Sequence, residues 1–273
     1  MKILYSNGSS TTYGLDLIKP KEIALSSTEY KKKYTYTGIL GNSLSIPETI
    51  NAAEPGSPNS SIVRRTFYDV TELLNKYKNH EILVCISFSP ATPVEFFLRK
   101  YKRYFNLIFP EKLLFKIKDD PEYKIHEIKK MYEFYNESVI CLDYLVEKFV
   151  FDVVSLQNFL ENKKIKHFFF HTAPIISSHI DINTHIIDFQ KIPDISFNKK
   201  VISQLLNECK FTGLLNPSPW LDFNTSSIIE YCFIKHKVIT GKTGHIIEDG
   251  HQLWAQFLKE KILNDDKNIR SSK

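Results

Sequence analysis

The sequence lacks the long apolar stretches that mark membrane proteins. No run in its 273 residues approaches the 18 uncharged apolar residues that suggest a transmembrane helix. The apolar run at residues 1–5 is too short for a secretory signal peptide, and Asn7 and Gly8 follow it almost at once. We therefore expect no membrane segment and a cytoplasmic protein.

Arginine is scarce, which bears on nucleic-acid binding. The chain has 31 lysines but only 5 arginines, and its formal net charge is +5. The lysines are spread along the chain, whereas a nucleic-acid-binding protein usually gathers its basic side chains into one patch or stripe. The pattern indicates a solvated, lysine-rich surface, and we expect no nucleic-acid partner.

Paired cysteines are absent as well. Cys85, Cys141, Cys209 and Cys232 are far apart and form no Cys-x-x-Cys pair of the kind that zinc sites use. A hydrophobic share of 42% in a chain of this length is enough to bury a large core without disulfide or metal cross-links. We expect neither a metal nor a cofactor.

Apolar runs and helical spacings alternate along the chain. Short β-rich runs predict strands, and longer stretches with apolar residues three and four positions apart predict helices. Strands are predicted at 2–6, 81–88 and 166–172, with weaker ones within 42–56 and at 185–189, and helices at 62–79, 138–163, 198–209 and 249–263. This alternation is typical of a three-layer α/β/α fold with a doubly wound parallel sheet.

One domain accounts for residues 1–263, and the polar segment 264–273 reads as a frayed tail. Residues 94–150 are the least regular part, rich in Phe, Tyr and Lys. We expect them to form a helical insertion with loops, including a helix near 122–136. The aromatic residues there fit a packed core better than a sugar-binding platform.

Two segments near the ends of the chain could carry chemistry. Ser10 follows the first predicted strand in a loop that lacks both the Gly-x-Ser-x-Gly elbow and a phosphate-binding Gly-Lys-Ser/Thr. His245 precedes the last predicted helix, a good place for a general base. Ligands of doubly wound sheets bind beyond the carboxyl ends of the strands. Either residue alone would more often be structural, so the case depends on the pair.

The segment from Asn7 to Gly14 resembles the Asn-Gly-Cys-Ser-Phe-Thr-x-Gly variant of the first sequence block of SGNH/GDSL hydrolases, which bacterial and phage members carry. Gly8 and Ser10 fall on the glycine and the nucleophile of that block, and Gly14 falls on its last glycine, so the resemblance implies structural roles for both glycines. The resemblance implies an SGNH-like sheet of the flavodoxin-like kind with Ser10 as the nucleophile.

Two further segments resemble blocks of the same family. Residues 51–64 are similar to the second block, where Gly56 falls on the glycine whose N–H joins the oxyanion hole and Asn59 is assigned a structural role. Residues 245–251 are similar to the His-Pro-x5-Gly-His motif, which implies that His245 is the catalytic base and His251 a structural histidine.

The chain departs from the family pattern at the supporting positions. The family's aspartate lies three residues before its histidine, and here that residue is Lys242. Asp222 is a candidate substitute from elsewhere in space. The third block, Gly-x-Asn-Asp in the family, is replaced by Ser87-Phe88-Ser89-Pro90, so Ser89 is the remaining candidate for an oxyanion donor from that block.

The resemblance implies a serine esterase or deacetylase that acts on an acylated small molecule or a carbohydrate through Ser10 and His245. An acetyltransferase would use the same two residues. The rival hypothesis, favoured by Lys242 and the missing asparagine, is a catalytically silent SGNH-like binding or structural module, with a phage as one candidate source. The enzyme hypothesis predicts that Ser10 Oγ and His245 lie within about 2.6–3.5 Å of each other. Neither the substrate nor the oligomeric state follows from the sequence.

Overall fold

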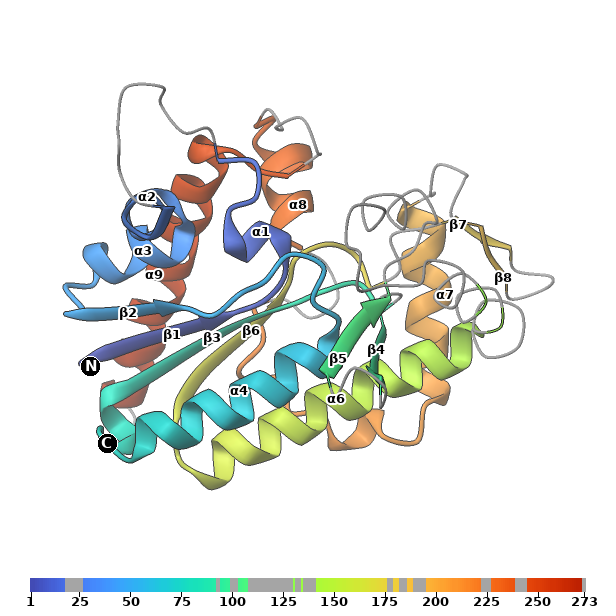
Figure 1. The fold of residues 1–273 in the computed structure, drawn as a ribbon, viewed down its shortest axis with the longest axis horizontal. Coiled ribbons are helices and arrows are strands. Elements are labelled where there is room, and N and C mark those ends of the chain that lie inside the picture. The colour runs from blue at the N-terminus through green and yellow to red at the C-terminus, as the bar shows by residue number, and fades with distance from the viewer. Residues whose placement is uncertain are drawn as a thin grey trace.

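Four parallel strands form the central sheet in a computed structural model of the chain (Figure 1). The structure describes residues 1–17, 27–91, 94–98, 103–107, 130, 134, 141–175, 179–181, 186–188, 195–221, 227–238 and 245–271. The strands are β1 (Ile3–Asn7), β2 (Glu48–Asn51), β3 (Ile82–Phe88) and β6 (Lys166–His171). Their order is β2-β1-β3-β6, so the winding reverses between β1 and β3. In such sheets the ligand crevice lies at that reversal, beyond the carboxyl ends of the strands.

A short stretch of backbone extends the sheet beyond β6. The N–H of Phe169 donates to the carbonyl of Pro219 at 2.9 Å, and the N–H of Leu221 donates to the carbonyl of Phe169 at 2.9 Å. Phe169 and Trp220 form a parallel bridge. The stretch occupies the fifth position of a flavodoxin-like strand order.

Helices cover both faces of the sheet (Figure 1). One face is covered by α4 (Asn59–Leu74), α6 (Leu142–Asn162) and α7 (Ile195–Glu208). The other is covered by α3 (Tyr36–Ser43) and α9 (Glu248–Ser271), with α2 (Ser27–Tyr34), α8 (Ile228–Glu230) and the π-helical turn η4 (Tyr231–Lys235) beside them. Two 3-10 turns, η1 (Asn79–Glu81) and η3 (Thr212–Leu214), lie in the connections. The result is the predicted three-layer α/β arrangement.

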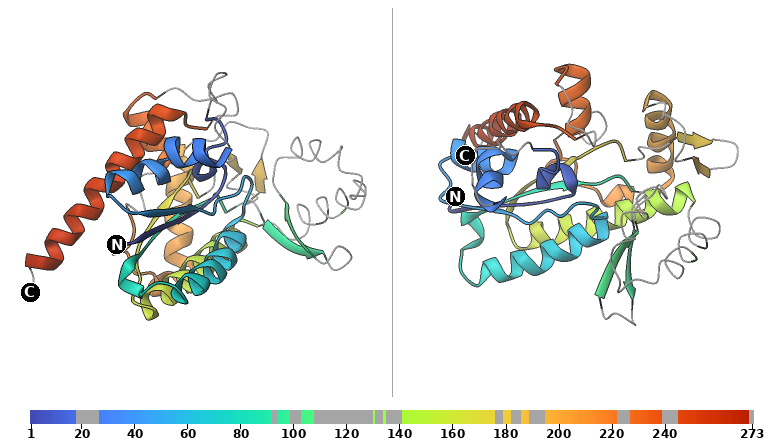
Figure 2. Two further views of the ribbon diagram at one scale, coloured as in Figure 1. Left: turned by 60° about the vertical axis from the view of Figure 1, so that its left-hand side comes forward. Right: turned by 45° about the horizontal axis from the view of Figure 1, so that its top comes forward.

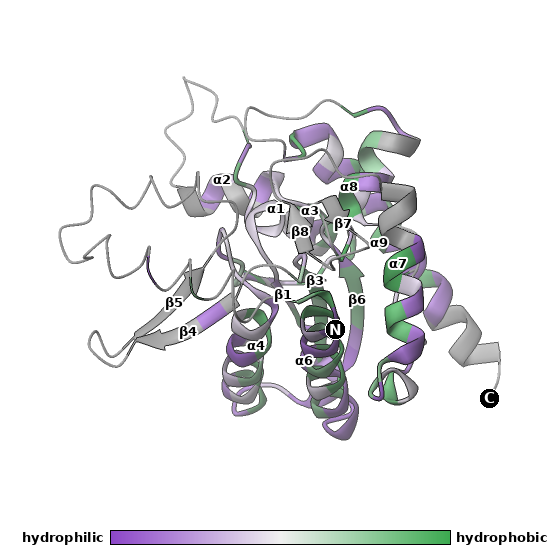
Figure 3. Ribbon diagram, turned by 90° about the vertical axis from the view of Figure 1, so that its right-hand side faces the viewer, coloured by the Kyte–Doolittle hydropathy of each residue, from purple (hydrophilic) through white to green (hydrophobic). Residues whose placement is uncertain are grey.

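The central strand β3 shows why the sheet needs both helical layers. All seven of its residues are buried. Ile82, Val84 and Ile86 belong to the hydrophobic cluster shared with α4 and α6, whereas Leu83 and Cys85 belong to the cluster shared with α3 and α9. Alternate side chains of a strand point to opposite faces, so a continuous apolar run requires cover on both. In Figure 3, β3 and β6 are largely green, and α4 and α6 mix green with purple as amphipathic helices do.

The insertion differs from the expectation. Residues Val94–Leu98 (β4) and Arg103–Leu107 (β5) form an antiparallel hairpin, so the prediction of helices was wrong there. The register pairs Phe96 with Phe105 and Phe97 with Tyr104. Aromatic side chains stabilise strands by packing against each other across a strand pair. That packing explains why this aromatic segment forms a hairpin although its apolar residues show no regular spacing. The hairpin stands away from the body of the sheet in Figure 2. The predicted helix near 122–136 lies mostly outside the described residues.

The remaining predictions differ in detail. The helix predicted at 138–163 is confirmed as α6. The strand predicted at 185–189 is present as β8 (Ile186–Asp188), but it pairs with β7 (His179–Asp181) in a separate ribbon. The tail predicted to fray from residue 264 is helical to Ser271, because it continues a helix that is already anchored by buried residues such as Trp254.

Candidate functional site

The loop after β1 places Ser10 at the start of the short helix α1 (Ser10–Tyr13), above the carboxyl ends of β1 and β3 (Figure 1). Gly8 makes this position possible. A Cβ atom at Gly8 would lie 2.9 Å from the Ser87 carbonyl oxygen at the end of β3, which is closer than real side chains approach. The structural role predicted for Gly8 therefore has a steric basis: any side chain would push the Ser10 loop away from β3.

Asn7 fixes the same loop to α4. Its buried side-chain amide donates to the carbonyl of Ile62 at 3.1 Å and to Thr66 Oγ1 at 3.0 Å, both on α4. Its side-chain oxygen accepts the N–H of Gly8 at 2.8 Å. Buried hydrogen bonds of this kind fix a loop because breaking them leaves polar groups without partners.

His245 lies opposite Ser10, just before α9. Its Nε2 is 2.6 Å from Ser10 Oγ, although the two residues are 235 positions apart in the sequence. When Ser10 donates this hydrogen bond, Nε2 is unprotonated and a neutral His245 carries its proton on Nδ1; in the other tautomer Nε2–H donates to Oγ. The distance falls within the range expected from the sequence, and the catalytic role of the pair remains a proposal.

Asp16 is a site residue that the sequence analysis missed. One of its carboxylate oxygens, Oδ2, accepts the backbone N–H of His245 at 3.1 Å and lies 3.7 Å from His245 Nδ1. The Asp16 side chain is only 8% exposed. A lone acid six residues after the serine matches no block of the family, so no sequence signal marked it. The acid considered instead, Asp222, and Lys242 both lie outside the described residues.

Two opposing effects set the protonation of His245. Burial lowers its pKa from the ordinary value of 6.5, because a charged imidazolium is poorly solvated there. The negative charge of Asp16 raises the pKa and offsets part of this effect. The net direction is downward, so His245 is neutral at pH 7 and able to accept a proton.

His251, predicted to be structural, connects the histidine segment to the serine segment. It is fully buried, and its Nδ1 accepts the backbone N–H of Tyr36 at 3.1 Å. The hydroxyl of Tyr36 in turn donates to Thr12 Oγ1 in α1 at 3.0 Å. Burial, aided by the nearby His245, lowers the pKa of His251 to about 3. His251 is therefore neutral, and through Tyr36 its hydrogen bond links α9 to α3 and α1.

Gly14 ends α1 and turns the chain back toward the site. Its φ of 78° is in the left-handed region, which glycine adopts without strain. A Cβ atom there would also lie 2.6 Å from Leu17 Cδ1. Both observations give the predicted structural role of Gly14 a physical reason.

Gly56 lies in a tight turn next to the loop that carries Ser10, where the Glu54 N–H donates to the Gly8 carbonyl at 3.4 Å. Ser57 N–H donates to the Glu54 carbonyl at 3.3 Å across Pro55 and Gly56, and Gly56 has a φ of 73°. Proline followed by a residue of positive φ is the signature of a type II turn. The hydrogen bond of the turn uses the N–H of Ser57 and leaves that of Gly56 outside it.

Side chains tie this turn to α1 and α4. The amide of Asn51 donates to the Thr12 carbonyl in α1 at 2.7 Å. Arg65 of α4 donates to the Ala52 carbonyl at 2.6 Å and forms an ion pair with Glu54. The segment that carries Gly56 is thereby joined to both α1 and α4.

Ser89 differs from the expectation. Its hydroxyl donates to the carbonyl of Ser57 at 2.8 Å, and the residue is 1% exposed. Asn59 accepts the Ser89 N–H at 2.8 Å and donates to the Ser89 carbonyl at 3.0 Å. The hydroxyl predicted as an oxyanion donor is thus engaged within the loop, because it has only one proton to donate. Both bonds of Asn59 hold the backbone of Ser89, and its structural role remains a prediction.

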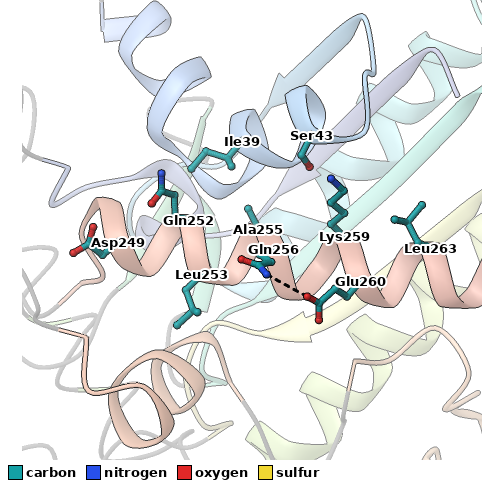
Figure 4. Close-up of a pocket in the computed structure, with 10 residues that line it drawn as sticks. All are labelled: Ile39, Ser43, Asp249, Gln252, Leu253, Ala255, Gln256, Lys259, Glu260 and Leu263. Atoms are coloured by element: carbon teal, nitrogen blue, oxygen red, sulfur yellow. Dashed lines mark hydrogen bonds between the residues drawn. The ribbon is translucent and has the colours of Figure 1, made fainter.

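A groove of about 690 Å³ lies elsewhere, between α3 and α9 (Figure 4). It is lined by Ile39, Ser43, Asp249, Gln252, Leu253, Ala255, Gln256, Lys259, Glu260 and Leu263. Neither Ser10 nor His245 contributes to it, so it is separate from the candidate site.

The described residues contain no group of three or more His, Cys, Asp or Glu side chains arranged to hold a metal ion. In the same part of the chain, no helix combines the length and the apolar character needed to cross a bilayer.

Residues 15–188 match the model of a family of unknown function, DUF6071. The chain belongs to this family. The match includes Asp16, Gly56 and Ser89 but neither Ser10 nor His245, so membership in DUF6071 is silent on the contact between those two. No curated protein matches the sequence.

Several solved structures are remotely similar to this DUF6071 member. A lipolytic protein of the G-D-S-L family from Desulfitobacterium hafniense DCB-2 has 11% identity and a TM-score of 0.43, covering 95% of this chain and 99% of that one. A carbohydrate esterase, described as having divergent catalytic and non-catalytic binding functions in its active site, has 12% identity and a TM-score of 0.39, covering 96% and 68%. The α/β hydrolase LAE5 from the metagenome of Lake Arreo, Spain, has 12% identity and a TM-score of 0.40, covering 93% and 91%. Likenesses this remote support no inference about activity.

Proposed function

We propose that this chain is a serine esterase or deacetylase of the SGNH/GDSL type, acting on an acylated small molecule or carbohydrate. The observation that carries the proposal is the 2.6 Å contact between Ser10 Oγ and His245 Nε2 at the carboxyl edge of a parallel sheet. A hydroxyl within hydrogen-bond reach of a neutral imidazole is the arrangement that activates a serine nucleophile.

The proposed reaction proceeds in two acyl-transfer steps. His245 Nε2 takes the proton of Ser10 as Oγ forms a bond to the ester carbonyl carbon. The tetrahedral intermediate then collapses, the bond to the alcohol oxygen breaks, and His245 returns the proton to the departing alcohol. Water repeats the sequence on the acyl-enzyme, which releases the carboxylic acid and restores Ser10.

Two backbone N–H groups are suited to hold the oxyanion. Ser10 is the first residue of α1, and the first N–H groups of a helix have no acceptor within it. The N–H of Gly56 lies outside the hydrogen bond of its own turn, on a segment that Asn51 and Arg65 hold against the serine loop. Donors fixed in advance lower the barrier without reorganising during the reaction.

The test is hydrolysis of p-nitrophenyl acetate together with labelling by a fluorophosphonate. We expect turnover by the wild type and covalent attachment of one phosphonyl group to the peptide that contains Ser10, with fluoride as the leaving group. Ser10→Ala should lose about a thousandfold or more of the activity and all of the label. Ser43→Ala is a matched control, because Ser43 lies in α3 with its hydroxyl bonded to the Leu40 carbonyl.

Three outcomes separate the alternatives. Equal turnover by the wild type and Ser10→Ala would reject Ser10 as the nucleophile. A chain that neither hydrolyses the ester nor reacts with the fluorophosphonate would be the silent module. Labelling without hydrolysis, together with transfer of the acetyl group from p-nitrophenyl acetate to an added sugar hydroxyl by unlabelled protein, with p-nitrophenol as the leaving group, would identify a transferase.

A further inference from the structure

We propose that Asp16 is the acid that orients His245 and stabilises its protonated form, so that nucleophile and acid come from the same N-terminal stretch of chain. This inference rests on the proposed function, for which Ser10 and His245 supply the nucleophile and the base. It assigns a third residue to the site where the sequence pattern offered Lys242 or Asp222.

The imidazole lies between two groups that are only six residues apart. Ser10 Oγ is 2.6 Å from Nε2, and Asp16 Oδ2 is 3.7 Å from Nδ1 on the other side of the ring. The same Oδ2 accepts the His245 backbone N–H at 3.1 Å. The acid thus holds both the backbone and the side chain of the base.

The fold of residues 10–17 explains how one short segment reaches both sides of the ring. Leu15 N–H donates to the Ser10 carbonyl at 3.1 Å, and Leu17 N–H donates to the Gly14 carbonyl at 3.4 Å. Together with the left-handed conformation of Gly14, these bonds turn the chain back so that Asp16 returns to the level of Ser10. A Cβ atom at Gly14 would lie 2.6 Å from Leu17 Cδ1, so a side chain there would move residues 15–17 and with them Asp16.

The chemistry of the contact depends on the state of His245. At 3.7 Å the contact between Oδ2 and Nδ1 is electrostatic, longer than a formed hydrogen bond. When His245 takes the proton of Ser10, it becomes a cation beside an 8% exposed carboxylate, and the attraction strengthens. Catalytic contacts often tighten only in the substrate complex. Asp16 would thus favour the protonated base that the reaction requires.

A merely structural role makes a different prediction. If Asp16 only anchors the backbone of His245, its charge is unimportant and an amide should serve equally well. Asp16→Asn is therefore the decisive variant, because its side-chain oxygen can still accept the His245 N–H while the charge is gone. Asp16→Glu keeps the charge and tests for partial rescue. Asp152→Asn is the matched control, a buried acid on α6 paired with Lys148.

The readouts are the kinetics of p-nitrophenyl acetate hydrolysis and the titration of the His245 ring by NMR, assigned with His245→Gln. For Asp16→Asn we expect kcat to fall at least a hundredfold with KM nearly unchanged, and Asp16→Glu to recover part of the loss. Among the described residues, the negative charge of Asp16 acts on the ring, and His251 acts on it when protonated. Removing the charge of Asp16 should move the pKa of His245 further below 6.5.

The outcomes distinguish this inference from the proposed function. If Asp16→Asn keeps its kcat within threefold while Ser10→Ala is inactive, Asp16 is not the acid and the esterase proposal stands. If the wild type itself shows no turnover, the esterase proposal fails, and the titration still decides on Asp16. An unchanged His245 titration in a folded Asp16→Asn protein would overturn the inference in either case.

Discussion

The two halves of the candidate site use different chemical groups: side chains in one and backbone N–H groups in the other. In the base half, Ser10, His245 and Asp16 meet through side chains that come from opposite ends of the chain. In the oxyanion half, the groups available around Gly56 are backbone N–H groups, and the side chains serve to hold the loop. The base half therefore concentrates its chemistry in a few atoms, whereas the oxyanion half depends on the position of a whole segment.

This contrast implies different responses to perturbation. The base half is joined by buried contacts within one helical layer, among them the hydrogen bond from Tyr36 in α3 to His251 in α9. A change of charge there acts on buried groups, where its effect is largest. The oxyanion half is fixed by several independent bonds, including those from Asn51 and Arg65, so the loss of one should have a graded effect. Three variants, at His251, Gly56 and Ser89, test whether the two halves differ in this way.

Lowering the pH should reduce the free energy of unfolding because His251 is buried in its neutral form. Its ordinary pKa of 6.5 applies in the unfolded chain, and burial lowers the value to about 3 in the folded protein. Between these values the unfolded state binds the extra proton, so stability is complete above pH 6.5 and falls as the pH decreases. The expected slope is about 1.4 kcal/mol per pH unit. Protonation at Nδ1 would also remove the acceptor for the Tyr36 N–H.

Urea unfolding at pH 6.5 and pH 4.5 measures this effect. The loss of stability between the two pH values should be about 2.5 kcal/mol smaller in His251→Gln than in the wild type, since other titrating groups cancel in the comparison. His80→Gln, which changes an exposed histidine in η1, should behave like the wild type. Identical pH dependence in His251→Gln and the wild type would show that His251 is not the buried neutral group described here.

The oxyanion half should respond to strain at Gly56. Gly56→Ala places a side chain at a φ of 73°, at a cost of about 1–2 kcal/mol. The turn keeps its N–H but shifts, so we expect kcat for p-nitrophenyl acetate to fall about tenfold, less than the full loss of an oxyanion donor. The titration of His245 should not change. Gly213→Ala is the control, because a Cβ atom there meets nothing within 4 Å. A stability loss without any change in kcat would exclude the turn from the reaction.

The sequence predicts those parts of the molecule where burial or a motif restricts which residue types can occur. Residues 81–88 are continuously apolar because β3 is covered on both faces. Ser10, Gly56 and His245 became candidates because the segments around them resemble the sequence blocks of a family in type and order. The hairpin at 94–107 is harder, since short aromatic-rich segments fit a helix or a strand until a partner strand is known.

Asp16 and Ser89 show why the rest of the site was not predictable. The contact of Asp16 with His245 joins residues 229 positions apart, and a single acid in a loop has no local pattern. Ser89 has the right residue type for an oxyanion donor, but the direction of its proton depends on the Ser57 carbonyl, which only the folded loop brings near. Tertiary contacts place both side chains.

Substitution of Ser89 should therefore have the smallest effect on kcat, and it tests directly whether the oxyanion half uses a side chain. Ser89→Ala removes the donor to the Ser57 carbonyl, a buried acceptor, and should cost about 1 kcal/mol of stability in urea unfolding. Because that proton is engaged in the loop, kcat for p-nitrophenyl acetate should change less than threefold. A hundredfold fall in kcat with unchanged stability would instead make Ser89 a direct oxyanion donor, freed from Ser57 when substrate binds. The oxyanion half would then depend on a side chain, as the base half does, and the contrast between the two would disappear.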